Sequence, residues 1–110
     1  MVTRTEDYQG IVAAVNDYAA GQNGDMVRLK NAFYPEAMIN GQPIEALYQT
    51  VERKGKTDST IRIDSVDITG YAAIAKVVTE NWHGARFVEY MSLLKSETGW
   101  RIIAKTFSPF

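Results

Sequence analysis

The sequence contains no cysteine and only one histidine, His83. The lack of cysteine excludes disulfide bonds, thiol nucleophiles and thiolate metal sites. A single histidine excludes metal sites that are built from several imidazoles. We therefore expect neither a bound metal ion nor another cofactor.

The chain also lacks an excess of one charge and lacks long apolar runs. It carries 12 Lys and Arg against 13 Asp and Glu, a formal net charge of -1. Nothing would attract a phosphate backbone over long range, so we expect no nucleic-acid partner. No stretch approaches the roughly 18 apolar residues that mark a transmembrane helix. The continuous apolar run of a signal peptide is missing as well, so we expect no membrane association and a cytoplasmic location.

Hydrophobic residues are plentiful, at 45% of 110 residues. This is enough for the core of one domain spanning residues 1–110. In the first half, apolar side chains recur at intervals of three and four from Tyr8 to Tyr18, which predicts a helix. Pro35 should stop a second helix over residues 26–33, because the residue before a proline avoids helical geometry. Pro43 should open a third helix that continues to Lys54.

The second half alternates like strands of a sheet. Strands are expected over residues 37–40, 60–68, 72–82, 86–96 and 100–107. The parity of the alternation changes near Asp64 and Ser65, which indicates a β-bulge. Helices followed by an antiparallel meander predict an α+β fold.

Two hairpin loops, residues 83–85 and 97–99, set a strand register if each is a three-residue connection. One face then carries Ala73, Ala75, Val77, Phe87, Met91, Leu93, Ile103 and Phe107. The opposite face carries Ile74, Val78, Trp82, Val88, Tyr90, Leu94, Trp100 and Ile102. Both faces are largely apolar, whereas a solvated face would be polar. We expect one face to cover the helices and the other to pack against a second copy of the chain, in a homodimer.

Two charged residues, Glu89 and Lys105, interrupt the face that covers the helices. They lie within side-chain reach of each other. If both are buried, each charge requires the other as its counter-charge. Two interpretations stay open: a structural ion pair, or the charged floor of a ligand pocket. The predicted pocket residues are Tyr18, Tyr48, Glu89, Met91, Lys105 and Phe107, and the predicted ligand is a small apolar or heteroaromatic molecule. No catalytic residue is assigned, because His83 lies in a predicted turn that faces solvent.

Several strings in a fixed order carry a resemblance to a known family. They are YAAGQNGD at 18–25, LKNAFYPEA at 29–37, ITGYAAIAKV at 68–77, EYMSLLK at 89–95 and GWRIIAKTF at 99–107. The chain resembles the "putative lumazine-binding" family of the nuclear-transport-factor-2-like superfamily, which also holds SnoaL-like polyketide cyclases and steroid isomerases. The resemblance implies a cystatin-like cone, in which N-terminal helices pack into a strongly curved antiparallel sheet. It also implies dimerisation through the sheets.

One departure from the relatives limits what the resemblance implies. Steroid isomerases place a catalytic aspartate just after the segment that resembles Glu36–Ile39, and here Asn40, Gly41 and Gln42 follow instead. The isomerase base is missing, so that reaction is not carried over. The short connection to Pro43 would leave the mouth of the cone less covered.

Three function classes remain. The first is a small-molecule-binding protein, which an open cavity would favour. The second is a polyketide-cyclase or isomerase-like enzyme that uses a pocket carboxylate or tyrosine. It would be favoured by Glu89 in a dry cavity without Lys105 close by. The third is a dimeric scaffold, which a cone filled by its own side chains would favour.

Overall fold

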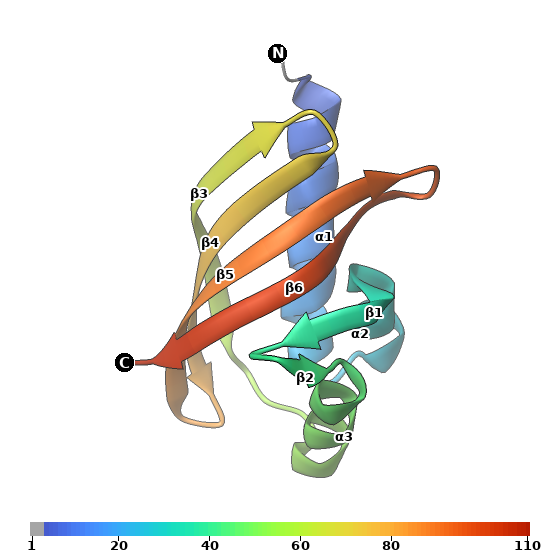
Figure 1. Ribbon diagram of the computed structural model, residues 1–110. Coiled ribbons are helices and arrows are strands. Elements are labelled where there is room, and N and C mark those ends of the chain that lie inside the picture. The colour runs from blue at the N-terminus through green and yellow to red at the C-terminus, as the bar shows by residue number, and fades with distance from the viewer. Residues whose placement is uncertain (1–3) are drawn as a thin grey trace.

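The computed structural model describes residues 4–110 (Figure 1). Within this range the elements are α1 (Thr5–Gln22), α2 (Met26–Ala32), β1 (Phe33–Ile39), β2 (Gln42–Pro43), α3 (Glu45–Lys54), β3 (Thr60–Thr69), β4 (Ala72–Trp82), β5 (Ala85–Ser96) and β6 (Gly99–Pro109). The strands form one curved sheet in the order β2-β1-β6-β5-β4-β3. Neighbouring strands are antiparallel except β1 and β6, which are parallel. The predicted α+β fold, with helices packed against a curved sheet, is confirmed.

The strand predicted over residues 37–40 begins earlier than expected. Ala32 ends α2, and Phe33 already has extended backbone angles. Pro35 therefore lies inside β1 rather than in a loop after the helix. A proline at a strand position removes one backbone donor, which a short strand near the edge of the sheet tolerates.

The core lies between α1 and the concave face of the sheet, as Figure 1 shows with α1 running behind the sheet. The predicted stripe of α1 supplies Ile11, Val15 and Tyr18 to this core. Gly21 lets α2 pack closely, because a Cβ atom there would lie 2.4 Å from the Cβ of Leu29. The absence of a side chain at this position is thus a packing requirement.

The hairpin loops are shorter than predicted, so the predicted register is wrong in part. Ser96 pairs with Gly99, which leaves a two-residue loop at 97–98. Trp82 pairs with Ala85, and the intervening His83 and Gly84 both have positive φ, at 49° and 85°. Two residues with positive φ form the turn that best matches the twist of a hairpin.

Irregularities within the strands shift the register again. The predicted pairing of Met91 with Lys105 is confirmed, because a bulge between Ser92 and Leu93 compensates for the shorter loop. The predicted pairing of Leu94 with Ile102 is wrong, since Leu93 takes that partner. The predicted pairing of Val77 with Met91 is also wrong: Val77 pairs with Glu89 and Met91 with Ala75. The bulge expected near Asp64 is present, as a shift between Ile63 and Ser65.

These shifts move three side chains from the predicted outer face into the interior. Trp100 and Ile102 belong to the core. Ile103 shifts the other way: it was expected on the inner face, but it is only partly buried and lies outside the core cluster. Trp82 also packs against the core, because the strand is irregular just before it, where Asn81 has a φ of 63°. An inserted or left-handed residue reverses the alternation of every side chain beyond it.

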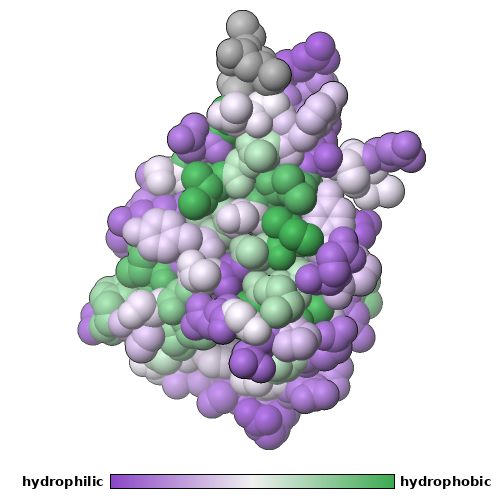
Figure 2. Space-filling model, in the orientation of Figure 1, coloured by the Kyte–Doolittle hydropathy of each residue, from purple (hydrophilic) through white to green (hydrophobic). Residues whose placement is uncertain are grey.

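The convex face of the sheet carries apolar side chains in contact with solvent. Ile74, Tyr90 and Leu94 are between 42% and 46% exposed. Figure 2 shows hydrophobic residues gathered over the middle of this face. Separately, no helix among residues 4–110 is long and apolar enough to cross a membrane.

Candidate functional site

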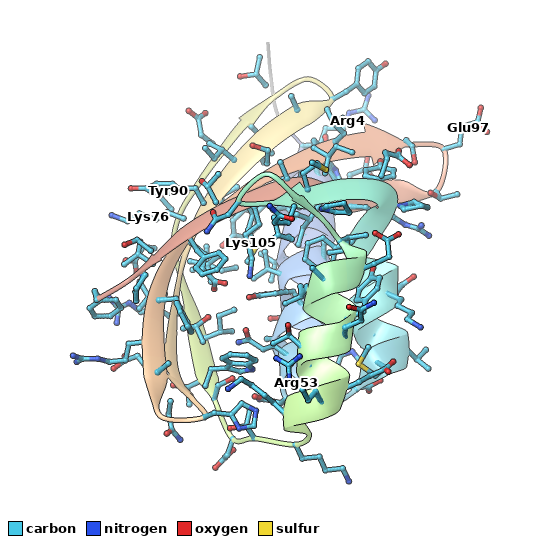
Figure 3. All side chains as sticks on the ribbon, turned by 60° about the horizontal axis from the view of Figure 1, so that its bottom comes forward. Arg4, Arg53, Lys76, Tyr90, Glu97 and Lys105 are labelled. Atoms are coloured by element: carbon cyan, nitrogen blue, oxygen red, sulfur yellow. The ribbon has the colours of Figure 1, made fainter. Side chains whose placement is uncertain are left out.

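A cavity of about 280 Å³ lies between the concave side of the sheet and the helices. Residues from α1, β1, β2, α3, β4, β5 and β6 line it, so it forms only in the folded chain. The lining residues are Tyr18, Gln22, Ile39, Asn40, Gln42, Ala46, Leu47, Thr50, Trp82, Phe87, Glu89, Lys105 and Phe107. In Figure 3, Lys105 lies in the space between the sheet and α3, whereas Lys76 and Tyr90 point outward from the convex face.

An ion pair forms the polar end of the cavity. The Lys105 Nζ lies 2.9 Å from Oε1 of Glu89, and the two residues are only 4% and 2% exposed. The Tyr18 hydroxyl accepts a hydrogen bond from the Lys105 Nζ at 2.7 Å and donates one to Oε1 of Glu89. The helix α1 and the consecutive strands β5 and β6 thus supply one closed triangle of hydrogen bonds.

The second carboxylate oxygen of Glu89 is also bonded. Thr79 donates its hydroxyl proton to Oε2 of Glu89 at 2.6 Å. Gln22 in turn donates to the Thr79 hydroxyl at 3.4 Å and to the Ser59 hydroxyl at 3.2 Å. These bonds hold the carboxylate in one orientation, because every oxygen has a fixed donor.

The electrostatics keep this end neutral as a whole. Burial raises the pKa of the Tyr18 phenol well above its ordinary value, and the nearby negative charge of Glu89 raises it further. Tyr18 therefore stays protonated and serves as a donor. The Lys105 ammonium also lies 4.6 Å from the ring centre of Tyr18 and 4.9 Å from that of Phe107, at the distance of a cation–π contact.

Aromatic side chains form the wall beyond the polar end. Phe87 makes edge-to-face contacts with Phe107 and with Trp82, with ring centres 5.4 and 6.1 Å apart. The Trp82 indole donates its N–H to the backbone oxygen of Gln22 at 2.9 Å, which fixes the ring. Lys54 from α3 lies 5.5 Å from the centre of the same ring. The wall is therefore apolar and held in place by contacts of its own.

A tight turn follows β1, in the segment that was compared above with that of steroid isomerases. Asn40 and Gly41 have φ values of 47° and 80° and connect β1 to β2 directly. The Asn40 side chain accepts from the Phe107 N–H at 2.9 Å and donates to the Phe107 carbonyl at 3.3 Å. Asn40 thus extends the pairing of β1 with β6, and its amide provides no base at this position.

The structure brings four of the six predicted pocket residues to the cavity: Tyr18, Glu89, Lys105 and Phe107. Met91 does not line it, because it lies two residues along β5 from Glu89 and is fully buried in the core. Tyr48 does not line it either. Its ring is half-buried on α3 and contacts Lys30 of α2, whose Nζ lies 5.6 Å from the ring centre. That these residues bind a ligand stays a prediction.

Sequence reasoning missed several lining residues. Gln22 could have been found, since it lies four residues after Tyr18 on α1. Thr79, which bonds Glu89 without lining the cavity, could also have been found, since it continues the inward alternation of Ala75 and Val77 along β4. Trp82 could not, because the irregularity before it leaves no pattern in the sequence. His83 lies in an exposed turn as predicted. In the described part of the chain, no three His, Asp or Glu side chains come together as metal ligands would.

Comparisons with known proteins agree with this architecture. Residues 6–108 match the sequence profile of the family described as "Putative lumazine-binding". The chain is similar to an NTF2-like protein of unknown function from Shewanella baltica, at 26% identity and a TM-score of 0.90 over 100% of this chain and 98% of that one. It is similar to another from Methylobacillus flagellatus, at 28% identity and a TM-score of 0.90 over 98% and 95%.

A more distant likeness shows the fold alone. A domain of unknown function with a cystatin-like fold from Nostoc punctiforme has 18% identity and a TM-score of 0.79, over 98% of this chain and 80% of that one. A search of curated proteins finds no match to the chain.

Proposed function

The chain belongs to the family described as "Putative lumazine-binding", and from this membership and the geometry of the site we propose that it binds a small heteroaromatic molecule in its cavity. The observation that carries the proposal is the cavity itself: apolar walls that end in a buried, hydrogen-bonded ion pair. Ligand sites commonly combine an apolar lining with a few fixed polar groups.

The dimensions of the cavity support a small ligand. A volume of about 280 Å³ lies just below the range of ligand pockets, which starts at about 300 Å³. The rings of Trp82, Phe87 and Phe107 along one wall favour a flat molecule that can stack on them or meet their edges. A one- or two-ring compound fits these limits.

Three observations favour binding over the other function classes. Lys105 lies 2.9 Å from Glu89, so the carboxylate is not the unpaired base that an enzyme of this type would need. Tyr18 is held in its protonated form by burial and by Glu89. The cone also retains an open volume, whereas a pure scaffold would fill it.

A thermal-shift screen of one- and two-ring aromatic compounds, pterins among them, tests the proposal, with flavins, steroids and aromatic polyketides as larger comparison compounds. A ligand that binds only the folded state must raise the melting temperature. Ala46→Trp, which fills the cavity from α3, should abolish the shift, whereas Ala13→Trp on the exposed side of α1 should preserve it. No shift across the library at saturating concentration would refute the proposal.

We also propose that the convex face pairs with a second copy of the chain. Ile74, Tyr90 and Leu94 expose apolar area there, which a partner sheet would cover. Sedimentation at micromolar concentration should give twice the mass of the chain. Ile74→Glu should reduce it to a single chain, and Val27→Glu, a change at an exposed position on α2, should not. A single-chain mass for the unmodified protein would contradict the dimer.

A further inference from the structure

The polar end of the cavity has one hydrogen-bond donor to spare. A lysine ammonium has three N–H groups. In Lys105 two of them are used, by the Tyr18 hydroxyl and by Oε1 of Glu89, and residues 4–110 offer no acceptor for the third. The hydroxyl proton of Tyr18 is also committed, to Glu89. What the polar end presents to an occupant is therefore the remaining N–H of Lys105.

The charge of this donor is already balanced. Glu89 and Lys105 are the only charged side chains among those that line the cavity in the described part of the chain, and they have opposite signs. An anion that entered would lose its hydration and find its counter-charge already paired with Glu89. An uncharged carbonyl oxygen would instead gain a charge-assisted hydrogen bond without adding net charge.

We propose, on the basis of the ligand-binding function proposed above, that the cavity selects uncharged aromatic ligands that carry a carbonyl group, and that Glu89 determines this selectivity by neutralising Lys105. Glu89 acts here through Lys105 rather than by contacting the ligand. Without the Glu89 charge, the same cavity would present an unbalanced cation and would accept aromatic carboxylates.

Two probes of equal ring system test the idea directly: 2-acetylnaphthalene, which is uncharged, and 2-naphthoate, which is an anion at pH 7. The affinity of each is measured by isothermal titration calorimetry. The carboxylate would lose its hydration without gaining a free counter-charge, so the wild type should prefer the ketone by at least roughly 10-fold, which corresponds to about 1.4 kcal/mol. Glu89→Gln keeps the shape of the side chain and removes its charge, and it should reverse the preference.

Glu36→Gln is the matched control. It changes the net charge by the same amount, but Glu36 lies exposed on β1 and outside the cavity lining, so the preference for the ketone should stay. The comparison of the two probes on the wild type needs no variant and still decides the question if Glu89→Gln does not fold.

The outcomes separate this inference from the proposed function. Equal affinity of the wild type for both probes, or a preference for the carboxylate, overturns the selectivity. If neither probe binds while the thermal-shift screen yields ligands, the selectivity is overturned and the binding function stands. If neither probe binds and the screen is blank, both fail. A Glu89→Gln protein that still prefers the ketone refutes the role given to Glu89.

Discussion

Removing one partner of the buried ion pair should destabilise the protein far more than removing both. Lys105→Met leaves the Glu89 carboxylate buried without its cation, and Glu89→Gln leaves the ammonium without its anion. Both residues are almost inaccessible to solvent, at 4% and 2% exposure, so water cannot screen the charge that remains. Breaking such a pair costs about 3–5 kcal/mol.

The double variant Glu89→Gln/Lys105→Met carries no charge at this position. Its loss of stability should be smaller than that of either single variant, since replacing both members of a buried pair is often neutral. The introduced glutamine could still accept a hydrogen bond from Tyr18, which limits the number of groups left unbonded. The coupling energy of the cycle should therefore be several kcal/mol, of the size found for contacting buried charges.

Urea denaturation of the four proteins at pH 7 measures each free energy of unfolding. Similar m-values across the set would show that the denatured states are comparable. The reasoning is refuted if either single variant loses less than about 1 kcal/mol, the value typical of an exposed pair. It is also refuted if the double variant loses the sum of the two single changes.

Three further predictions concern packing and pH. Gly21→Ala should lower the free energy of unfolding by about 1–3 kcal/mol, since its Cβ would meet Leu29; an unchanged urea midpoint would contradict this. Because the pKa of Tyr18 is raised in the folded state, stability should fall as the pH rises above about 10, and Tyr18→Phe should flatten that slope in urea titrations. The hydrogen bond from Lys95 lowers the pKa of Asp7 in the folded state. The stability that the ionised Asp7 contributes should therefore be lost as the pH falls below about 4. In thermal melts, Asp7→Asn should show a smaller drop in melting temperature below pH 4 than the wild type. The same drop in both proteins would refute this prediction.

Much of the fold could be predicted because its signals are local. The apolar period of α1 and the alternation along β4 depend on neighbouring residues alone, and the predicted bounds of β4, residues 72–82, are those observed. Bulges and turn lengths are harder, since a single residue with positive φ, such as Asn81, reverses the faces beyond it.

The contact of Glu89 with Lys105 could be predicted for a different reason. Two opposite charges on a buried, otherwise apolar face are expected to pair whatever the detailed register, because an unpaired buried charge is costly. The opposite wall could not be predicted in the same way. Ala46 and Thr50 reach the cavity through the placement of α3, which depends on contacts between segments distant in the chain.

Two parts of the chain form the cavity, and each supplies a different side of it. The long elements α1, β5 and β6 supply the polar end, whereas the excursion from the Asn40–Gly41 turn to Gly55 supplies β2 and α3 as the opposite wall. Substitutions at Leu47 or Thr50 can therefore reshape the space without disturbing the ion pair. This division lets ligand preferences change through substitutions in the excursion while the ion pair is kept.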